Sequence, residues 1–153
     1  MASFDTRNAF PHRGGLTLLE LLVVLTVLGV LVGLALPRAR GASARRAARA
    51  AARDVALLLS AGRQIAATSA HGAAVAFDEE GGTVRLVVAG DTVRTLDLAA
   101  VHGVALEASR DSLAYDWRGL GAGAANLTVV VARPPAAETL YVSRLGRVRG
   151  GRW

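Results

Sequence analysis

The chain has 153 residues, 52% of them hydrophobic, and no cysteine, so it can bury the core of one ordinary domain but cannot form a disulfide or a thiolate metal site. The formal net charge of +6 is unevenly spread: residues 38–53 carry six arginines and no acid, residues 54–143 carry six arginines and ten acids (−4), and residues 144–153 carry four arginines. Because the central part is mildly acidic, the total charge alone does not indicate a nucleic-acid-binding protein.

The N-terminal region combines a short polar segment with a long apolar one. Residues 1–15 are polar, contain Pro11 and end in two glycines, and we interpret them as a leader peptide. From Leu16 to Pro37 the only charged residue is Glu20. Twenty-two helical residues rise about 33 Å, which matches a hydrocarbon core of about 30 Å. The pattern therefore predicts a transmembrane helix over residues 16–37.

The helical pattern continues over residues 38–71, which are rich in alanine and arginine, both good helix formers. Apolar residues recur there at helical spacing and predict a face that packs on a core. The members of this apolar stripe are Val55, Leu58, Leu59, Gly62, Ile65 and Ala66. Pro37 is predicted to kink or break the helix, and His71-Gly72 to end it. We expect one helix from about Leu16 to Ala70, amphipathic in its second half.

Residues 72–153 change to short β-branched segments separated by glycine and proline turn signals. The segments predicted as strands are 73–77, 83–89, 93–98, 101–108, 113–117, 126–132 and 139–145. They predict a β-rich globular domain with a half-buried antiparallel sheet. The fold class is therefore α+β, with the long N-terminal helix packed on a C-terminal antiparallel sheet domain.

Three interpretations account for the apolar segment. The first is a cleaved secretory signal, since Ala42-Ser43-Ala44 fits a small-x-small cleavage site, but the apolar run exceeds the usual 7–15 residues or so. The second is a plain single-pass anchor. The third is a subunit whose apolar helix moves from the membrane into a helical filament. Only the third gives Glu20 a purpose, because an ionisable residue within a membrane helix usually has a partner.

The residues Gly15, Leu16, Thr17, Leu18, Leu19 and Glu20, followed by an unbroken apolar run, resemble the class III signal of type IV pilins and type II secretion pseudopilins. The resemblance implies cleavage between Gly15 and Leu16 by a prepilin peptidase and N-methylation of Leu16, where phenylalanine is commoner in the family. It also implies a single-pass protein of the bacterial inner membrane, with residues 72–153 in the periplasm. The arginines of residues 38–53 run against that orientation on the positive-inside rule, and we follow the motif.

Cleavage after Gly15 would create an ammonium group on Leu16, four residues before Glu20. In a stack of helices that ammonium on one subunit can meet the Glu20 carboxylate of the next, so that each charge neutralises the other in an apolar filament core. Glu20 is therefore our candidate assembly residue. Gly29 and Gly33 form a G-x-x-x-G face that permits close helix approach, although glycine is also ordinary in membrane helices.

Three later stretches, residues 57–77, 115–131 and 140–149, are similar to the H-type minor pseudopilin (GspH/FimT) family. That resemblance implies a minor pseudopilin of the type II secretion system, near the tip of a short periplasmic pseudopilus that supports protein export. Its partners would be other major and minor pseudopilins and the inner-membrane assembly platform.

The alternative is a minor type IV pilin that binds DNA during uptake. FimT-like proteins carry a glycine-arginine-x-arginine tail, and Gly146-Arg147-Val148-Arg149 matches it. The candidate DNA-binding residues are Arg144, Arg147, Arg149 and Arg152. Four arginines on four phosphates predict a log–log salt slope of about −3.6 on duplex DNA. Trp153 would be able to stack on a base, and the competing interpretation is a solvated, arginine-rich strand.

Nothing in the sequence favours an enzyme. The three histidines are far apart, and neither a H-E-x-x-H nor a G-x-S-x-G motif is present. Residues 78–80 are acidic, but a solvated hairpin turn beside Gly81-Gly82 explains them better than calcium binding. We therefore expect no catalytic residue, no metal and no cofactor.

Overall fold

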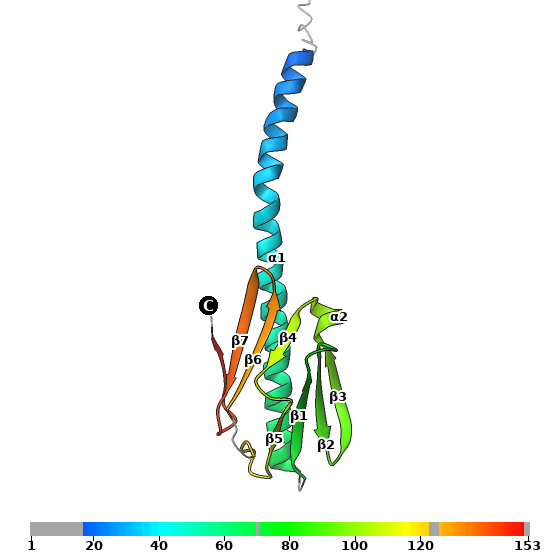
Figure 1. Cartoon of the computed structure of the whole chain (residues 1–153), viewed down its shortest axis with the longest axis vertical. Coiled ribbons are helices and arrows are strands. Elements are labelled where there is room, and N and C mark those ends of the chain that lie inside the picture. The colour runs from blue at the N-terminus through cyan, green and yellow to red at the C-terminus, as the bar shows by residue number, and fades with distance from the viewer. Residues whose placement is uncertain (1–16, 70, 123–125, 152–153) are drawn as a thin grey trace, which may run out of the picture. The chain divides into compact units, whose positions relative to one another are not determined.

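The structure is a computed structural model that describes residues 17–69, 71–122 and 126–151 (Figure 1). It divides into two compact units, Met1–Pro37 and Arg38–Trp153. Helix α1, Leu18–Thr68, contains Pro37 within it. The sequence had predicted a kink or a break at Pro37, and the prediction of a break is wrong. Proline costs a helix one N–H donor, but its fixed φ of about −65° is itself helical, so the chain can continue through it.

In the first unit, the part of α1 that precedes Arg38 is apolar on all sides. Its leucine and valine side chains are exposed, from Leu18 at 82% to Val24 at 48%. An 18-residue window of α1 near its N-terminus has a mean hydropathy of 2.7 and no buried residue. By length and composition this part of α1 is able to cross a membrane.

In the second unit, α1 buries one face. The predicted apolar stripe is confirmed, since Val55, Leu58, Leu59, Gly62 and Ala66 are buried and Ile65 packs against the core while partly exposed. Before Val55 the buried face consists of residues no larger than alanine. These residues are Gly41, Ala44, Ala48, Ala51 and Ala52. Small side chains let the strands approach the helix closely, and at Gly62 an added Cβ would lie 3.0 Å from Leu86 Cδ1.

The strands form two four-stranded antiparallel sheets that share one core with α1, whereas the sequence had predicted a single sheet region (Figure 1). One sheet has the order β3-β2-β1-β5 and the other β4-β6-β7-β8. The bounds are β1 Ala73–Asp78, β2 Thr83–Val88, β3 Asp91–Asp97, β4 Ala105–Ala108, β5 Ser112–Tyr115, β6 Leu127–Arg133, β7 Ala136–Val142 and β8 Val148–Gly151. The division arises because β5 turns back to pair with β1 while β4 pairs with β6. Alternation along each strand cannot reveal such pairing.

The predicted strand over 101–108 is only half right. Its first part belongs to a short helix, α2 Leu98–His102, and β4 begins at Ala105. The Asp97 carboxylate accepts a hydrogen bond from Ala100 N at 2.7 Å, and Gly103 ends the helix in the left-handed region at φ 60°. Asp97 is thus an N-cap and Gly103 a C-terminal glycine, and these local signals outweighed the β-branched composition.

The acidic turn at residues 78–80 has a structural role. The Asp78 carboxylate accepts from Gly81 N at 2.9 Å, and the Glu79 carboxylate accepts from Ala108 N at 2.8 Å. Both bonds use carboxylate oxygens to satisfy backbone donors. Among the described residues, no group of three or more histidine, aspartate or glutamate side chains could hold a metal ion.

Candidate functional site

The first turn of α1 contains the candidate assembly residue Glu20. Thr17 lies just before the helix, and its Oγ1 accepts a hydrogen bond from Glu20 N at 3.2 Å. Thr17-x-x-Glu20 has the spacing of a capping box, in which a threonine and a glutamate satisfy free N–H groups at a helix start. Gly15 and Leu16, the predicted processing residues, lie outside the described residues.

The Glu20 carboxylate itself is exposed, with apolar side chains before and after it in the sequence. Within residues 17–69 no side chain or backbone group is hydrogen-bonded to it; only its own N–H is used, by Thr17. A carboxylate at a helix N-terminus gains about 0.3–1 kcal/mol from the helix dipole at an exposed site. That gain is smaller than the 2.5–3.5 kcal/mol or so that a charge costs deep in a bilayer, so an external partner would still stabilise it.

Gly29 and Gly33 lie on the same face of this half of α1, four residues apart. A Cβ built at either position meets no atom within 4 Å. Neither glycine is therefore required by packing among the residues that the structure describes. Both remain available to another helix.

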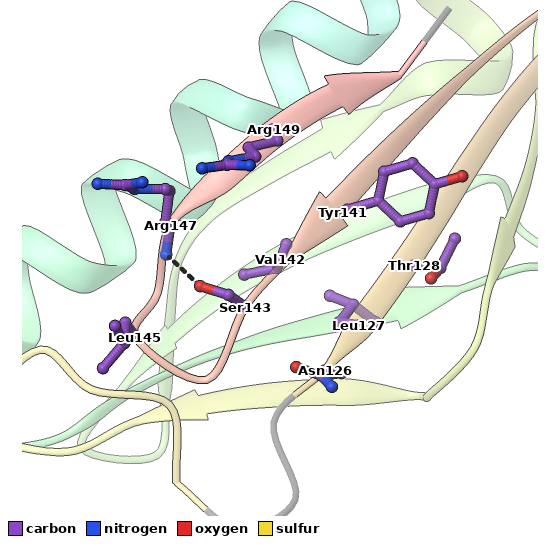
Figure 2. A pocket seen from close by; sticks show the side chains of 9 residues that line it. All are labelled: Asn126, Leu127, Thr128, Tyr141, Val142, Ser143, Leu145, Arg147 and Arg149. Carbon is purple, nitrogen blue, oxygen red and sulfur yellow. Dashed lines mark hydrogen bonds between the residues drawn. The ribbon is translucent and has the colours of Figure 1, made fainter. Parts of the chain in front are cut away.

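The C-terminal arginines border a groove of about 530 Å³ on sheet β4-β6-β7-β8, which we call the tail groove (Figure 2). Arg147 comes just before β8 and Arg149 lies within it, and both line the groove. Figure 2 shows their side chains extending in the same direction, away from Val142. Val148, between them, packs against the core. Period-2 alternation thus places two guanidinium groups on one face.

The other predicted DNA-binding arginines are placed differently. Arg144 is exposed and does not line the tail groove, and its carbonyl accepts a hydrogen bond from Gly121 N at 3.1 Å. Arg152, like Trp153, lies outside the described residues. Ser143 Oγ accepts from Arg147 N at 3.3 Å, which fixes the backbone where the arginine pair begins (Figure 2).

A second groove, of about 480 Å³, lies between α1 and the start of β8, and we call it the helix-side groove. It is lined mainly by Ser60, Arg63, Gln64, Arg118, Gly146 and Arg147. Arg147 therefore belongs to both grooves. Arg63 and Arg118 were not predicted as site residues, because nothing in their local pattern shows that α1, residues 116–119 and residues 143–147 meet.

Arg63 contacts the two turns beside the helix-side groove, at Gly119 and at Gly146. Its Nε donates to Gly119 O at 3.0 Å, and Gly146 lies against its side chain, where an added Cβ would be 3.1 Å from Arg63 Cδ. Gly119 and Gly146 both adopt positive φ, 71° and 70°, which a side chain would strain. Glycine is therefore required at both turns.

Tyr115 is buried beneath this region, and its hydroxyl has no hydrogen-bond partner among the described residues. Burial raises the pKa of Tyr115 to about 12, while the positive charge of Arg63 acts in the opposite direction. A neutral tyrosine in an apolar site is a packing group. Nothing in this geometry equips Tyr115 for proton transfer.

The comparisons with known proteins fit this arrangement. Residues 11–36 match the model of the prokaryotic N-terminal methylation motif. No curated relative matches the chain. The chain thus combines the N-terminal methylation motif with a long N-terminal helix packed on antiparallel sheets, an α+β arrangement with a pilin-like fold.

Within that class, the solved structures that the chain resembles are minor subunits. The minor pseudopilin EpsH from the type 2 secretion system of Vibrio cholerae has a TM-score of 0.58 and 11% identity over 71% of this chain and 95% of that chain. A second EpsH structure gives 0.57 and 14% over 69% and 96%. The type IV minor pilin FimU of Pseudomonas aeruginosa gives 0.55 and 14% over 67% and 91%. At such identities the likeness establishes the fold, which is that of pilin-like minor subunits.

Proposed function

We propose that the protein is a minor pseudopilin of a type II secretion system, a subunit near the tip of a periplasmic pseudopilus. A prepilin peptidase cuts it between Gly15 and Leu16 and methylates Leu16. The helix of residues 16–37 anchors it in the inner membrane, and residues 72–153 lie in the periplasm. It then joins other major and minor pseudopilins through the assembly platform. The methylation motif and the likeness to EpsH support this proposal.

The observation that carries the assembly role is the exposed Glu20 carboxylate, which lacks a hydrogen-bond partner among residues 17–69. In a filament, the new ammonium on Leu16 of a neighbouring subunit supplies the opposite charge. Such a pair is favourable in low dielectric only with close geometry, so it also fixes the axial register between subunits.

The competing role for Glu20 is local, as one half of the capping box with Thr17. Glu20→Gln separates the two roles, since glutamine also occupies this position of a capping box but carries no charge. We expect Glu20→Gln and Glu20→Ala both to insert into the membrane and both to fail in filament incorporation, measured by cross-linking to neighbouring subunits in cells. Thr26→Ala, which removes another polar group from the same helix, is the matched control and should assemble normally. Normal assembly of Glu20→Gln would show that Glu20 acts only as part of the capping box and not as a charged docking group.

The choice of filament is tested in the native host. We expect deletion of the gene to abolish export of secreted proteins into the medium and to leave the uptake of labelled DNA unchanged. Mass spectrometry of the mature protein should find an N-methylated Leu16 at its start. Retained export with lost DNA uptake would reverse the assignment.

A second candidate function is DNA binding as a minor type IV pilin, favoured by Arg147 and Arg149 on one face of the tail groove. We expect the double variant Arg147→Ala, Arg149→Ala to abolish salt-sensitive retention of duplex DNA by the full chain in detergent. The double variant Arg85→Ala, Arg94→Ala removes the same charge from exposed positions on β2 and β3, and should retain DNA. Equal loss of DNA retention in both double variants would indicate that binding depends on net charge alone.

A further inference from the structure

The helix-side groove is a cationic site assembled from three separate parts of the chain. Arg63 comes from α1, Arg118 from the turn after β5, and Arg147 from the approach to β8. The other polar side chains that line it are the neutral Ser60 and Gln64. No aspartate or glutamate is among the described residues that line it. Three guanidinium groups therefore share one groove without a lining carboxylate to neutralise them.

None of the three has a carboxylate partner among the described residues, and Arg63 keeps its Nη groups unbonded although its Nε donates to Gly119 O. Arg49 Nε is 3.1 Å from Glu138 Oε1, and Arg133 Nη1 donates to His102 O at 3.2 Å. By contrast, among the described residues the Arg63 guanidinium donates through Nε alone, and its two Nη groups have no hydrogen-bond acceptor there. Donors of this kind in a groove are suited to phosphate oxygens.

An exposed aromatic ring stands beside this groove. Trp117 is 63% exposed, and the Arg118 guanidinium carbon lies 4.6 Å from the centre of its ring. Since Arg118 lines the groove, the tryptophan lies at its margin. A positively charged groove next to an aromatic platform is the combination with which proteins bind single-stranded nucleic acids, because every base has a flat face that can stack. In a duplex the bases are already stacked on each other and do not reach such a ring.

We propose that the helix-side groove binds single-stranded DNA, with Arg63, Arg118 and Arg147 on successive phosphates and one unpaired base on Trp117. This proposal rests on the second candidate function, DNA binding. It adds a strand preference and three residues, Arg63, Trp117 and Arg118, to the arginine tail. Arg147 lines both grooves, so the tail groove and the helix-side groove form one basic path around the start of β8.

The test uses the full chain in a non-ionic detergent with fluorescein-labelled single-stranded and duplex oligonucleotides of equal length. Stacking on an aromatic side chain is worth about 1–3 kcal/mol per base, so Trp117→Ala should weaken single-strand binding about 5- to 150-fold and leave duplex binding unchanged. Arg118→Ala should lower the magnitude of the single-strand log–log salt slope by about 0.7. Trp117→Phe keeps a stacking ring and should restore most of the affinity.

Two controls make the result specific. Arg110→Ala removes an exposed arginine elsewhere and should change neither affinity nor salt slope. In a Trp153→Phe background Trp117 is the only tryptophan, so its fluorescence should be quenched by single strands and not by duplex. Unchanged circular dichroism and melting temperature of Trp117→Ala show that a loss of binding is not a loss of fold.

The outcomes separate this inference from the function on which it rests. If Arg147→Ala with Arg149→Ala abolishes binding while Trp117→Ala and Arg118→Ala bind both DNA forms normally, the helix-side site is overturned and DNA binding stands. Equal weakening of single-strand and duplex binding in Trp117→Ala overturns the stacking assignment. If the unaltered protein binds neither form, the candidate function and the inference fail together.

Discussion

The two halves of α1 belong to one helix, but their side chains lie in different surroundings. Before Pro37 the side chains are mostly leucine and valine, and all of them are exposed. After Arg38 the buried face is built from glycine and alanine until Val55, and arginines lie exposed on the rest of the helix. Large apolar residues on every side suit a lipid or helical neighbour that can approach from any direction. Small residues on one face suit a fixed sheet at short distance.

Hydrophobicity alone therefore does not show what a helix segment packs against. The first half is the more apolar, yet its leucine and valine side chains are exposed. The second half is rich in arginine, and it contributes much of the core. What distinguishes them is whether apolar residues surround the helix or keep to one stripe.

The largest expected effect comes from truncating a buried leucine in the second half. Leu58 is 1% exposed, whereas its neighbour Leu57 is 67% exposed. We expect Leu58→Ala to lower the free energy of unfolding by about 2–5 kcal/mol, through lost burial and the cavity left behind. Leu57→Ala is the matched control and should stay within about 0.5 kcal/mol. Thermal unfolding of the full chain in detergent measures both, and a similar loss in both variants would contradict the one-sided packing.

Gly62 and Gly29 contrast the same residue type in the two halves. At Gly62 an added Cβ would lie 3.0 Å from Leu86 Cδ1 and 3.2 Å from Val75 Cγ2, while at Gly29 it meets nothing within 4 Å. Gly62→Val should therefore destabilise the protein by about 1–3 kcal/mol through overpacking. Gly29→Val should leave the melting temperature unchanged. If Gly29→Val also blocks filament assembly, the G-x-x-x-G face is an interface between helices.

The pH dependence of Tyr115 tests the surface on which the second half of α1 packs, since the Tyr115 ring lies next to Gly62. Below about pH 10 the tyrosine is neutral in both the folded and the unfolded chain. Between pH 10 and the folded-state pKa of about 12 the unfolded chain ionises first, so the free energy of unfolding should fall with rising pH by up to about 3 kcal/mol.

Tyr115→Phe should lose that alkaline sensitivity. At neutral pH it should be about 1 kcal/mol more stable, because it removes a buried hydroxyl that has no partner among the described residues. Urea unfolding across pH 7–11.5 measures both effects. Tyr141→Phe, at a 42% exposed position, is the control and should keep the original pH profile.

The smallest expected effect is at the ion pair between α1 and β7. Arg49 Nε lies 3.1 Å from Glu138 Oε1, and the Arg49 side chain is 49% exposed. Solvent screening limits such a pair to about 0–1 kcal/mol. Arg49→Ala should thus shift the melting temperature by a few degrees at most, and 0.5 M salt should reduce the difference. A loss above 2 kcal/mol would mean that Arg49 acts through packing.

Much of the molecule follows from the sequence by itself. The apolar run predicted the N-terminal part of α1, because length and hydropathy are properties of consecutive residues. The stripe from Val55 to Ala66 predicted the buried face of α1, because helical geometry converts spacing directly into a face. The α+β class followed from the change of periodicity after Gly72.

Only the tertiary structure decided how the strands pair and which arginines meet. Strand alternation gives each strand a buried face but not a neighbour, so the two sheets were read as one. Asp97 and Gly103 were capping signals that the β-branched residues around them concealed. Arg63, Arg118 and Arg147 are 55 and 29 residues apart in the chain, and they meet because α1 packs on the turns at Gly119 and Gly146. Contacts between distant segments arise from packing of the whole core, which no local pattern encodes.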